Sequence, residues 1–428
     1  MTQPLSLEPV RLLNKVNVST FTFFMFQIYQ LDFFLRSSAR ISGIGIIRPT
    51  LLLFAIVAIT LFFQRDKLRE KMQHPIMKAM GVFLLVIIFT LPFVTYPGSV
   101  LRYHIPEFIK AIVFLYFMAL IVDTKGRLKW ALIIFVGCQV IRVLEPLYLN
   151  ITSGYWGAKT YMGGGEFANR LGGAPADVIN PNELGFVIVT VIPFLHYLLF
   201  SRGWFYKLIY LGLIPPLMYA LILTMSRGAF LALLVVGWVV WKESNHKVLL
   251  IGVAIGIAIG GWSVMNDTQR DRYFSLVSSD AAQSASAEGR LTGMVNEFKL
   301  GFKRPIFGHG LGTTSEAKAN SGMGTKASHN MYAEIMIELG LVGFFFFMGI
   351  IKKIYLQIRE STSIFYAETM DPLYRDLFKA LKVIFWMFAL YSLNYWGLSQ
   401  YYWYNLAGLV VAVSVLSHSQ IKQTRAQS

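Results

Sequence analysis

Residues 79–96 read AMGVFLLVIIFTLPFVTY and contain no charged side chain. A helix that crosses the ~30 Å hydrocarbon core of a bilayer needs about 20 predominantly apolar residues, and this run approaches that length. Its apolar residues follow one another without the period of two that marks a strand or the period of 3.6 that marks a half-buried helix. The run therefore predicts a membrane-spanning helix.

The composition extends this prediction to the whole chain of 428 residues, of which 55% are hydrophobic and only 14% are charged. Soluble domains carry about 25% charged residues, so a soluble multidomain protein is excluded, as are disordered, collagen-like and disulfide-rich classes. We predict an all-α polytopic membrane protein with about twelve spans. The predicted spans are residues 17–35, 49–63, 79–96, 107–122, 130–149, 184–200, 208–223, 228–241, 248–265, 329–351, 380–396 and 401–417.

The orientation follows from the basic residues, because cytoplasmic loops of membrane proteins are enriched in Lys and Arg. With the N-terminus in the cytoplasm, 22 Lys and Arg fall in cytoplasmic segments and 7 in short outer loops. Both termini are therefore predicted to be cytoplasmic, although three arginines in the outer 36–48 loop run against this topology. The net charge of +16 is thus assigned to cytoplasmic loops, and no nucleic-acid partner is expected.

The chain divides into three predicted parts. Residues 1–265 hold nine spans and an outer loop at 150–183, residues 266–328 form a long periplasmic loop, and residues 329–428 hold three spans and a cytoplasmic tail. Long loops in compact proteins are usually functional or disordered. The single cysteine, Cys138, excludes an intrachain disulfide, and the seven histidines are scattered, so no metal site is predicted.

Unusual polar residues fall on the predicted outer side. Arg227 lies in the turn TMSRGAF between two spans, Arg290 lies in the long loop, and the Asn182-Glu183 turn opens the sixth span. Arginine is permanently charged and grips phosphate oxygens through two parallel hydrogen bonds. Two arginines at the outer membrane surface would suit a lipid-linked diphosphate. The structural alternative is that Arg227 reaches the lipid interface and Arg290 is a solvated loop charge.

His329 opens the tenth predicted span, with Ser328 as its expected N-cap residue. In the first turn of a helix the positive end of the macrodipole favours the neutral imidazole, which is the form that a general base needs. Tyr332 is expected to share its face, and Asn330 lies between them. The structural alternative is a histidine that only belongs to the helix cap.

In chain order these pieces form a set of motifs: NRLGG and NPNELG before one span, a Ser-Arg-Gly turn, Gly-Arg, RPIFGHGLG, and HNMY followed by ELGLVG. The set, over about residues 165–350, resembles the O-antigen ligase/polymerase superfamily. The resemblance implies a GT-C-like glycosyltransferase of the bacterial inner membrane, facing the periplasm, with no cofactor and no metal.

Residue by residue, the resemblance implies that Arg227 and Arg290 hold the diphosphate of an undecaprenyl-diphosphate-linked glycan donor and that His329 is the base on the acceptor hydroxyl. Asn182, Glu183, Asn330 and Tyr332 are expected to support them. The implied acceptor is the lipid A core or another glycan, with membrane lipids around the protein. One base and no carboxylate nucleophile indicate a single displacement with inversion.

Two other functions remain open at this stage. A polymerase of the same superfamily would use a second lipid-linked glycan as acceptor. A transporter with twelve helices would place charged residues near the membrane midplane. Here Lys110 and Arg142 are the candidates for such residues, and no internal repeat is visible, so the enzyme is the preferred hypothesis.

Overall fold

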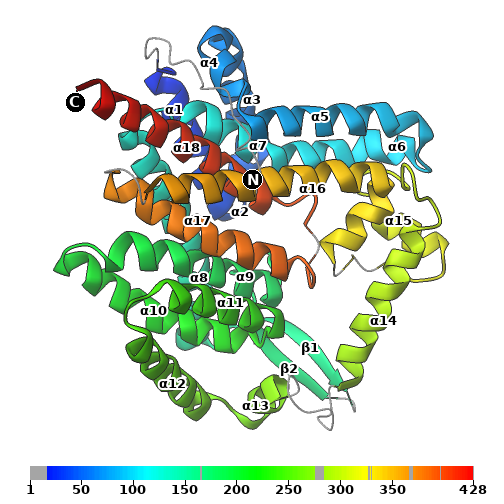
Figure 1. Ribbon diagram of the computed structural model, residues 1–428. Helices are drawn as coiled ribbons and strands as arrows, with labels where there is room; N and C mark the ends of the chain where they lie inside the picture. The colour runs from blue at the N-terminus through cyan, green and yellow to red at the C-terminus, as the bar shows by residue number, and fades with distance from the viewer. Residues whose placement is uncertain are drawn as a thin grey trace, which may run out of the picture.

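The computed structural model describes residues 17–163, 166–274, 284–325, 328, 330–365, 370–395 and 397–427. Every predicted span overlaps a helix. These helices are α1 (Thr20–Leu35), α3 (Pro49–Phe63), α5 (Pro75–Thr90), α7 (Ile105–Ile121), α8 (Lys125–Ser153), α9 (Pro181–Leu195), α10 (Trp204–Thr224), α11 (Arg227–Glu243), α12 (Lys247–Val264), α16 (Met331–Phe365), α17 (Pro372–Tyr391) and α18 (Tyr401–Gln427) (Figure 1).

Further elements connect them. They are α2 (Ser37–Arg40), α4 (Arg65–Met72), α6 (Pro97–Ser99), α13 (Asp267–Phe274), α14 (Ser284–Gly301), α15 (Thr314–Asn320), the 3₁₀ segments η1 (Ile44–Ile47) and η2 (Leu91–Phe93), the π segments η3 (Val100–His104) and η4 (His196–Phe200), and the strands β1 (Gly157–Gly163) and β2 (Glu166–Leu171).

Within the described residues, 8 helical segments are long and apolar enough to cross a membrane. The mostly helical, polytopic character of the fold is thereby confirmed. The remaining predicted spans form α1, α11, α12 and α17, of which α1 and α11 have only 16 and 17 residues. The number of twelve spans therefore stays a prediction.

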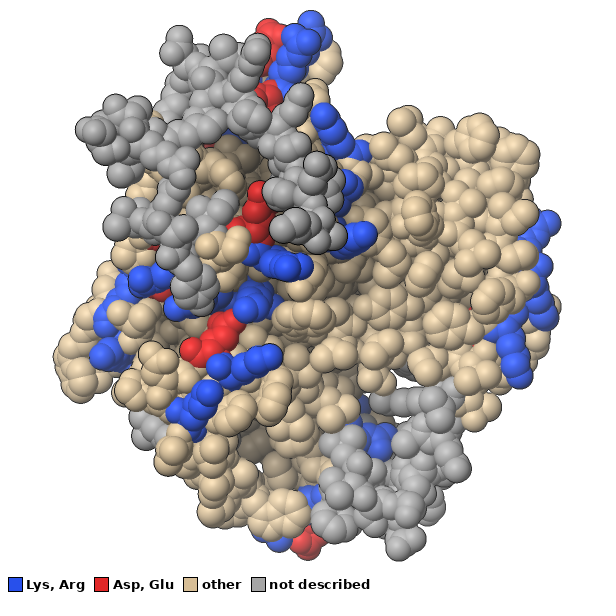
Figure 2. Space-filling model, in the orientation of Figure 1, with Lys and Arg blue, Asp and Glu red and all other residues tan. Residues whose placement is uncertain are grey.

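The surface charges agree with a membrane-embedded bundle. In Figure 2 a broad uncharged surface lies over α5 and α16, and Lys and Arg side chains gather at its two ends. Inside the bundle, α7 and α18 approach so closely that a Cβ on Gly408 would lie 2.9 Å from the Phe114 carbonyl oxygen. Small residues permit such close helix packing where no water drives helices together.

Residues 150–183 depart from the predicted all-α fold, because they contain an antiparallel hairpin in which Ala158 pairs with Arg170 and Lys159 with Asn169. The strand EFANRL alternates in burial: Ala168 and Arg170 are buried, whereas Phe167 and Asn169 are exposed. This period of two is the mark of a strand with one buried face. The glycine-rich composition concealed it at the sequence level.

The long predicted loop at 266–328 is also structured, since α13, α14 and α15 lie within it. The helices α16 and α17 extend beyond the predicted spans at the ends that face each other in the chain: α16 continues to Phe365, and α17 begins at Pro372. Hydropathy falls at the membrane surface, but nothing in these charged segments breaks a helix. The helices therefore continue past the predicted ends of the spans.

Helix α16 is broken at Gly340, whose φ of 61° and ψ of −164° are non-helical. The segment 305–310 fills the break. Leu341 N donates to Pro305 O at 2.7 Å, His309 N to Ile337 O at 2.8 Å and Gly310 N to Glu338 O at 2.8 Å. These bonds satisfy backbone groups that the break removes from the helix. Non-helical backbone at membrane depth is tolerated only where protein or a water-filled cavity surrounds it.

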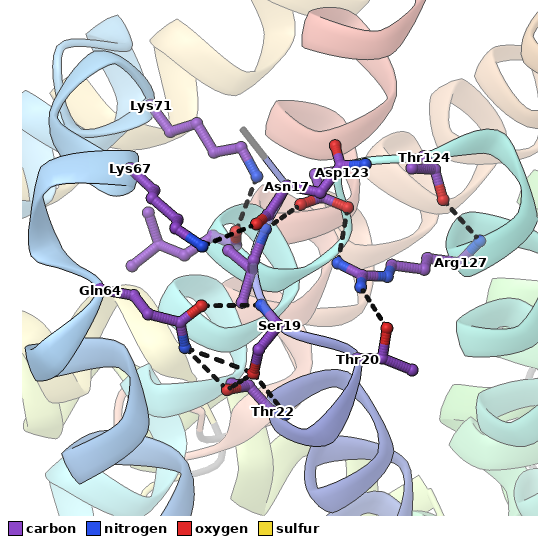
Figure 3. Close-up of polar contacts among 12 residues, drawn as sticks. Asn17, Ser19, Thr20, Thr22, Gln64, Lys67, Lys71, Asp123, Thr124 and Arg127 are labelled. Carbon is purple, nitrogen blue, oxygen red and sulfur yellow. Dashed lines mark hydrogen bonds and ion pairs between the residues drawn. The ribbon is translucent and has the colours of Figure 1, made fainter. Parts of the chain in front are cut away.

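A polar cluster ties the start of α1 to the ends of neighbouring helices (Figure 3). Asp123 accepts hydrogen bonds from Val18 N at 2.7 Å and from Arg127 Nη1 at 2.8 Å, and Ser19 N donates to Gln64 Oε1 at 2.7 Å. Lys71 Nζ donates to Leu120 O at 2.6 Å. This cluster fixes the chain where it enters the bundle.

Lys71 gives a pH test of this cluster. Burial lowers the pKa of Lys71 to about 8, whereas an unfolded lysine titrates near ~10.4. Between these values the unfolded chain binds more protons, so the contribution of Lys71 to stability rises with pH. We expect the melting temperature of wild-type protein in detergent to rise relative to that of Lys71→Met as the pH increases from about 8 to 10.5. A constant difference between the two across this range would contradict the shift.

Candidate functional site

The candidate site lies where the starts of α9, α11 and α16 meet the end of α17. At the start of α9, Asn180 Oδ1 accepts hydrogen bonds from Asn182 N at 2.9 Å and Glu183 N at 3.0 Å. Glu183 Oε2 accepts from Asn180 N at 3.1 Å, which completes a capping box. Asn-Pro-Asn-Glu is thus a helix start in which each residue has a defined geometric role.

The turn before α11 carries Arg227. Met225 adopts a left-handed conformation with φ of 49°, and Ser226 caps the helix by accepting from Ala229 N at 3.3 Å. Arg227 is then the first residue of α11, and its side chain is buried, with 6% exposed. The turn packs tightly on α9, since a Cβ on Gly185 would lie 2.6 Å from the Cβ of Ala229.

Arg170 connects this turn to the start of α9. Its Nε donates to Thr224 O at 2.8 Å, and its Nη2 donates to Asn182 Oδ1 at 2.8 Å. Because Thr224 is the last residue of α10, one buried guanidinium from β2 fixes both the turn that carries Arg227 and the Asn182 side chain.

Two tyrosines bring the end of α17 to the same place. Tyr391 OH donates to Asn182 O at 3.1 Å, and Tyr395 OH donates to Glu183 Oε1 at 2.7 Å. Both rings stack on Phe186, with centroid distances of 4.4 Å and 5.7 Å. The backbone carbonyl of Asn182 and the side chain of Glu183 therefore hold the start of α9 against the end of α17.

The start of α16 lies against the same end of α17. Met331 N donates to Ser392 O at 2.9 Å, and Tyr332 OH donates to Ala389 O at 2.8 Å. Asn330 Oδ1 accepts from Tyr332 N at 2.9 Å and from Ala333 N at 3.0 Å. The site thus combines Asn182, Glu183, Asn330 and Tyr332 around one helix end.

These contacts correct the predicted start of α16. Asn330, and not Ser328, caps the helix, because its amide oxygen reaches the second and third helical N–H groups. Position 329 therefore precedes the helix instead of lying in its first turn. The prediction that Ser328 is the N-cap residue is therefore wrong, whereas the relation of His329 to Tyr332 stays a prediction.

Two predicted site residues lie wholly or partly outside the described part of the chain. His329 lies outside the described residues. Arg290 belongs to α14, but its side chain is also outside the described part of the chain. Further along α14, Met294 Sδ accepts from Asn330 Nδ2 at 2.9 Å, so this helix lies beside the start of α16.

Arg142, predicted as a candidate charge near the midplane, forms a buried ion pair. Its Nε lies 2.6 Å from Asp177 Oδ2, and its Nη1 donates to Gln139 Oε1 at 2.9 Å. This pair anchors the segment before α9 to α8. Within the described residues, no group of three or more His, Cys, Asp or Glu could hold a metal ion.

Arg170, Tyr391 and Tyr395 belong to the site although the sequence did not predict them as site residues. The signal that could have indicated Arg170 is its place in Asn-Arg-Leu-Gly-Gly, at a buried position of an alternating strand. The tyrosines give no such signal, because they lie in a segment rich in aromatic residues.

Comparison with known families adds to this geometry. Residues 211–348 match the family model described as O-antigen ligase. The resemblance to the O-antigen ligase superfamily is confirmed. Search of the curated proteins finds no match. The O-antigen ligase segment contains Arg227, α14 and the start of α16, and it implies a glycosyltransferase-like membrane enzyme of O-antigen processing.

Proposed function

We propose that this protein is an O-antigen ligase-like glycosyltransferase. It transfers a glycan from undecaprenyl diphosphate to a hydroxyl of the lipid A core, on the periplasmic face of the bacterial inner membrane. The observation that carries the proposal is the buried Arg227 at the start of α11, a helix start that packs against the start of α9 and the end of α17. Helix N-termini bear partial positive charge and bind anions, so the arrangement suits a diphosphate.

In the proposed reaction the acceptor hydroxyl attacks the anomeric carbon, and the bond from that carbon to the diphosphate oxygen breaks. Arg227 and Arg290 neutralise the charge that develops on the diphosphate, and His329 takes the hydroxyl proton. Donors aimed at developing charge are worth about 10²–10³ in rate, and a general base adds about 10²–10⁴. One displacement inverts the anomeric carbon, and no step needs a bound metal.

Asn182, Glu183, Asn330 and Tyr332 support this reaction from a distance. Asn182, Glu183 and Tyr332 hold the starts of α9 and α16 against the end of α17, and Asn330 caps α16. The proposed topology keeps both termini in the cytoplasm and the site outside. A polymerase of the same superfamily would use a lipid-linked glycan as acceptor, so an assay that offers both acceptors separates the two enzymes.

The arginine pair provides the test. Lysine keeps the charge but loses the planar fork, so Arg227→Lys and Arg290→Lys are each expected to lower donor turnover by roughly tenfold or more. Purified protein would be assayed with an undecaprenyl-diphosphate glycan and a lipid A core acceptor, with EDTA present. Arg102→Lys, at an exposed arginine of another outer segment, is the matched control and should keep wild-type turnover. Wild-type turnover in both test variants would overturn the diphosphate assignment.

A further inference from the structure

A buried ion pair lies directly beside the segment that precedes α16. Glu297 of α14 accepts from Lys318 Nζ of α15 at 2.6 Å, and the side chains of both are almost fully buried, with 5% and 7% exposed. The second carboxylate oxygen, Oε2, lies 2.7 Å from Ser328 Oγ. A buried carboxylate thus uses one oxygen for the ion pair and the other for a serine hydroxyl.

The same serine also contacts the residue that caps α16. Asn330 N donates to Ser328 Oγ at 3.1 Å, so one side chain bridges the residues on either side of position 329. The Ser328 hydroxyl has a single proton, within reach of Glu297 Oε2 at 2.7 Å and Asn330 O at 2.9 Å. The contact to Glu297 is the shorter of the two, so the proton is directed to that carboxylate oxygen.

The residue after position 329 is fixed as well. Asn330 caps α16 through its Oδ1 and donates through Nδ2 to Met294, one turn before Glu297 on α14. Ser328 and Asn330 are both buried, with 2% and 1% exposed. Both neighbours of position 329 are therefore held by α14.

We infer that Glu297 is a positioning residue: through Ser328 it fixes the chain on either side of His329, and thereby the place of the proposed base. The inference rests on the proposed function, in which His329 is the base. Lys318 pairs with the carboxylate in its buried place. Because α14 also carries Arg290, one helix is connected both to the proposed diphosphate site and to the position of the base. A displacement of about 1 Å at a reacting group can cost 10²-fold in rate.

The first variant removes the Ser328 hydroxyl without breaking the ion pair between Glu297 and Lys318. Ser328→Ala removes the contact to Glu297 and the bridge to Asn330, and it leaves Glu297 paired with Lys318. We expect kcat to fall by about 10- to 100-fold, while the KM for the lipid-linked donor stays unchanged, because the arginines that hold the diphosphate are untouched. Ser328→Thr retains the hydroxyl and should restore most of kcat. Glu297→Gln is expected to lower kcat in the same direction, again with unchanged KM.

Ser414→Ala is the matched control, since Ser414 is a buried serine on α18 whose hydroxyl donates to Val411 O at 2.9 Å. It should keep the wild-type kcat. Wild-type kcat in both Ser328→Ala and Glu297→Gln would overturn the inference, as would failure of Ser328→Thr to exceed Ser328→Ala. His329→Ala, measured in parallel, separates the two proposals: if it retains transfer, the proposed base is wrong whatever Ser328 does.

Discussion

Replacement of His329 by alanine is expected to abolish glycan transfer while the protein remains folded and inserted in the membrane. Without a base, the acceptor hydroxyl must lose its proton to water, and the loss of a positioned base costs about 10²–10⁴ in rate. Lysine at this position should not restore transfer, because its unperturbed pKa near ~10.4 leaves it protonated at neutral pH. Transfer would be measured both with purified protein and by the glycan attached to the acceptor in cells.

The control is His246→Ala, because His246 is an exposed histidine in the connection between α11 and α12. This variant should retain full transfer. If His329→Ala transfers glycan at a rate near that of the wild type, the assignment of the base fails. The diphosphate role of Arg227 and Arg290 would then have to be judged from their lysine variants alone.

The largest effect on folding is expected from Gly340→Ala. The φ of 61° and ψ of −164° fall in a region that glycine alone adopts freely. A Cβ at this position would lie 2.4 Å from the Ile306 carbonyl oxygen, which is backbone and cannot rotate away. The strain and the displaced segment together should destabilise the protein by on the order of 3 kcal/mol or more.

Gly349→Ala is the matched control, because Gly349 lies in the same helix and a Cβ there would meet no atom within 4 Å. The measurement is the yield of monodisperse protein in detergent and its melting temperature. We expect Gly340→Ala to give little folded protein and Gly349→Ala to behave like the wild type. Equal yields and melting temperatures of the two variants would contradict the described break in α16.

The positions of the long helices could be predicted, because a long run of apolar residues with few charges is typical of a helix that crosses a membrane. The break at Gly340 could not be predicted, since the glycine lies within an apolar run. The hydrogen bonds between segment 305–310 and the broken helix join backbone atoms. Hydrogen bonds between main chains leave little mark on composition. The hairpin was missed for a related reason, because its alternation is short and interrupted by glycines.

The candidate site was predictable in its charged and motif-bearing residues but not in what holds them. The motifs indicated Arg227 and the Asn182-Glu183 turn, because both lie in short local patterns and because Asn and Pro mark the start of a helix. The contacts that hold these residues join distant parts of the chain. Examples are the hydrogen bonds of Arg170 with Thr224 and of Tyr391 with Asn182. No local pattern specifies such pairs, so they depend on the packed structure.

The break in α16 also bears on how the chain is assembled during synthesis. Residues 305–310 leave the ribosome before α16, and the N-terminal part of that helix completes its backbone hydrogen bonds only when this segment lies beside it. An unpaired backbone group in hydrocarbon costs several kcal/mol. Helix α16 therefore does not enter the bilayer as a single self-sufficient helix, as the uninterrupted α5 can. The insertion unit is the helix together with the segment translated just before it, so docking of that segment and insertion of α16 are one coupled event.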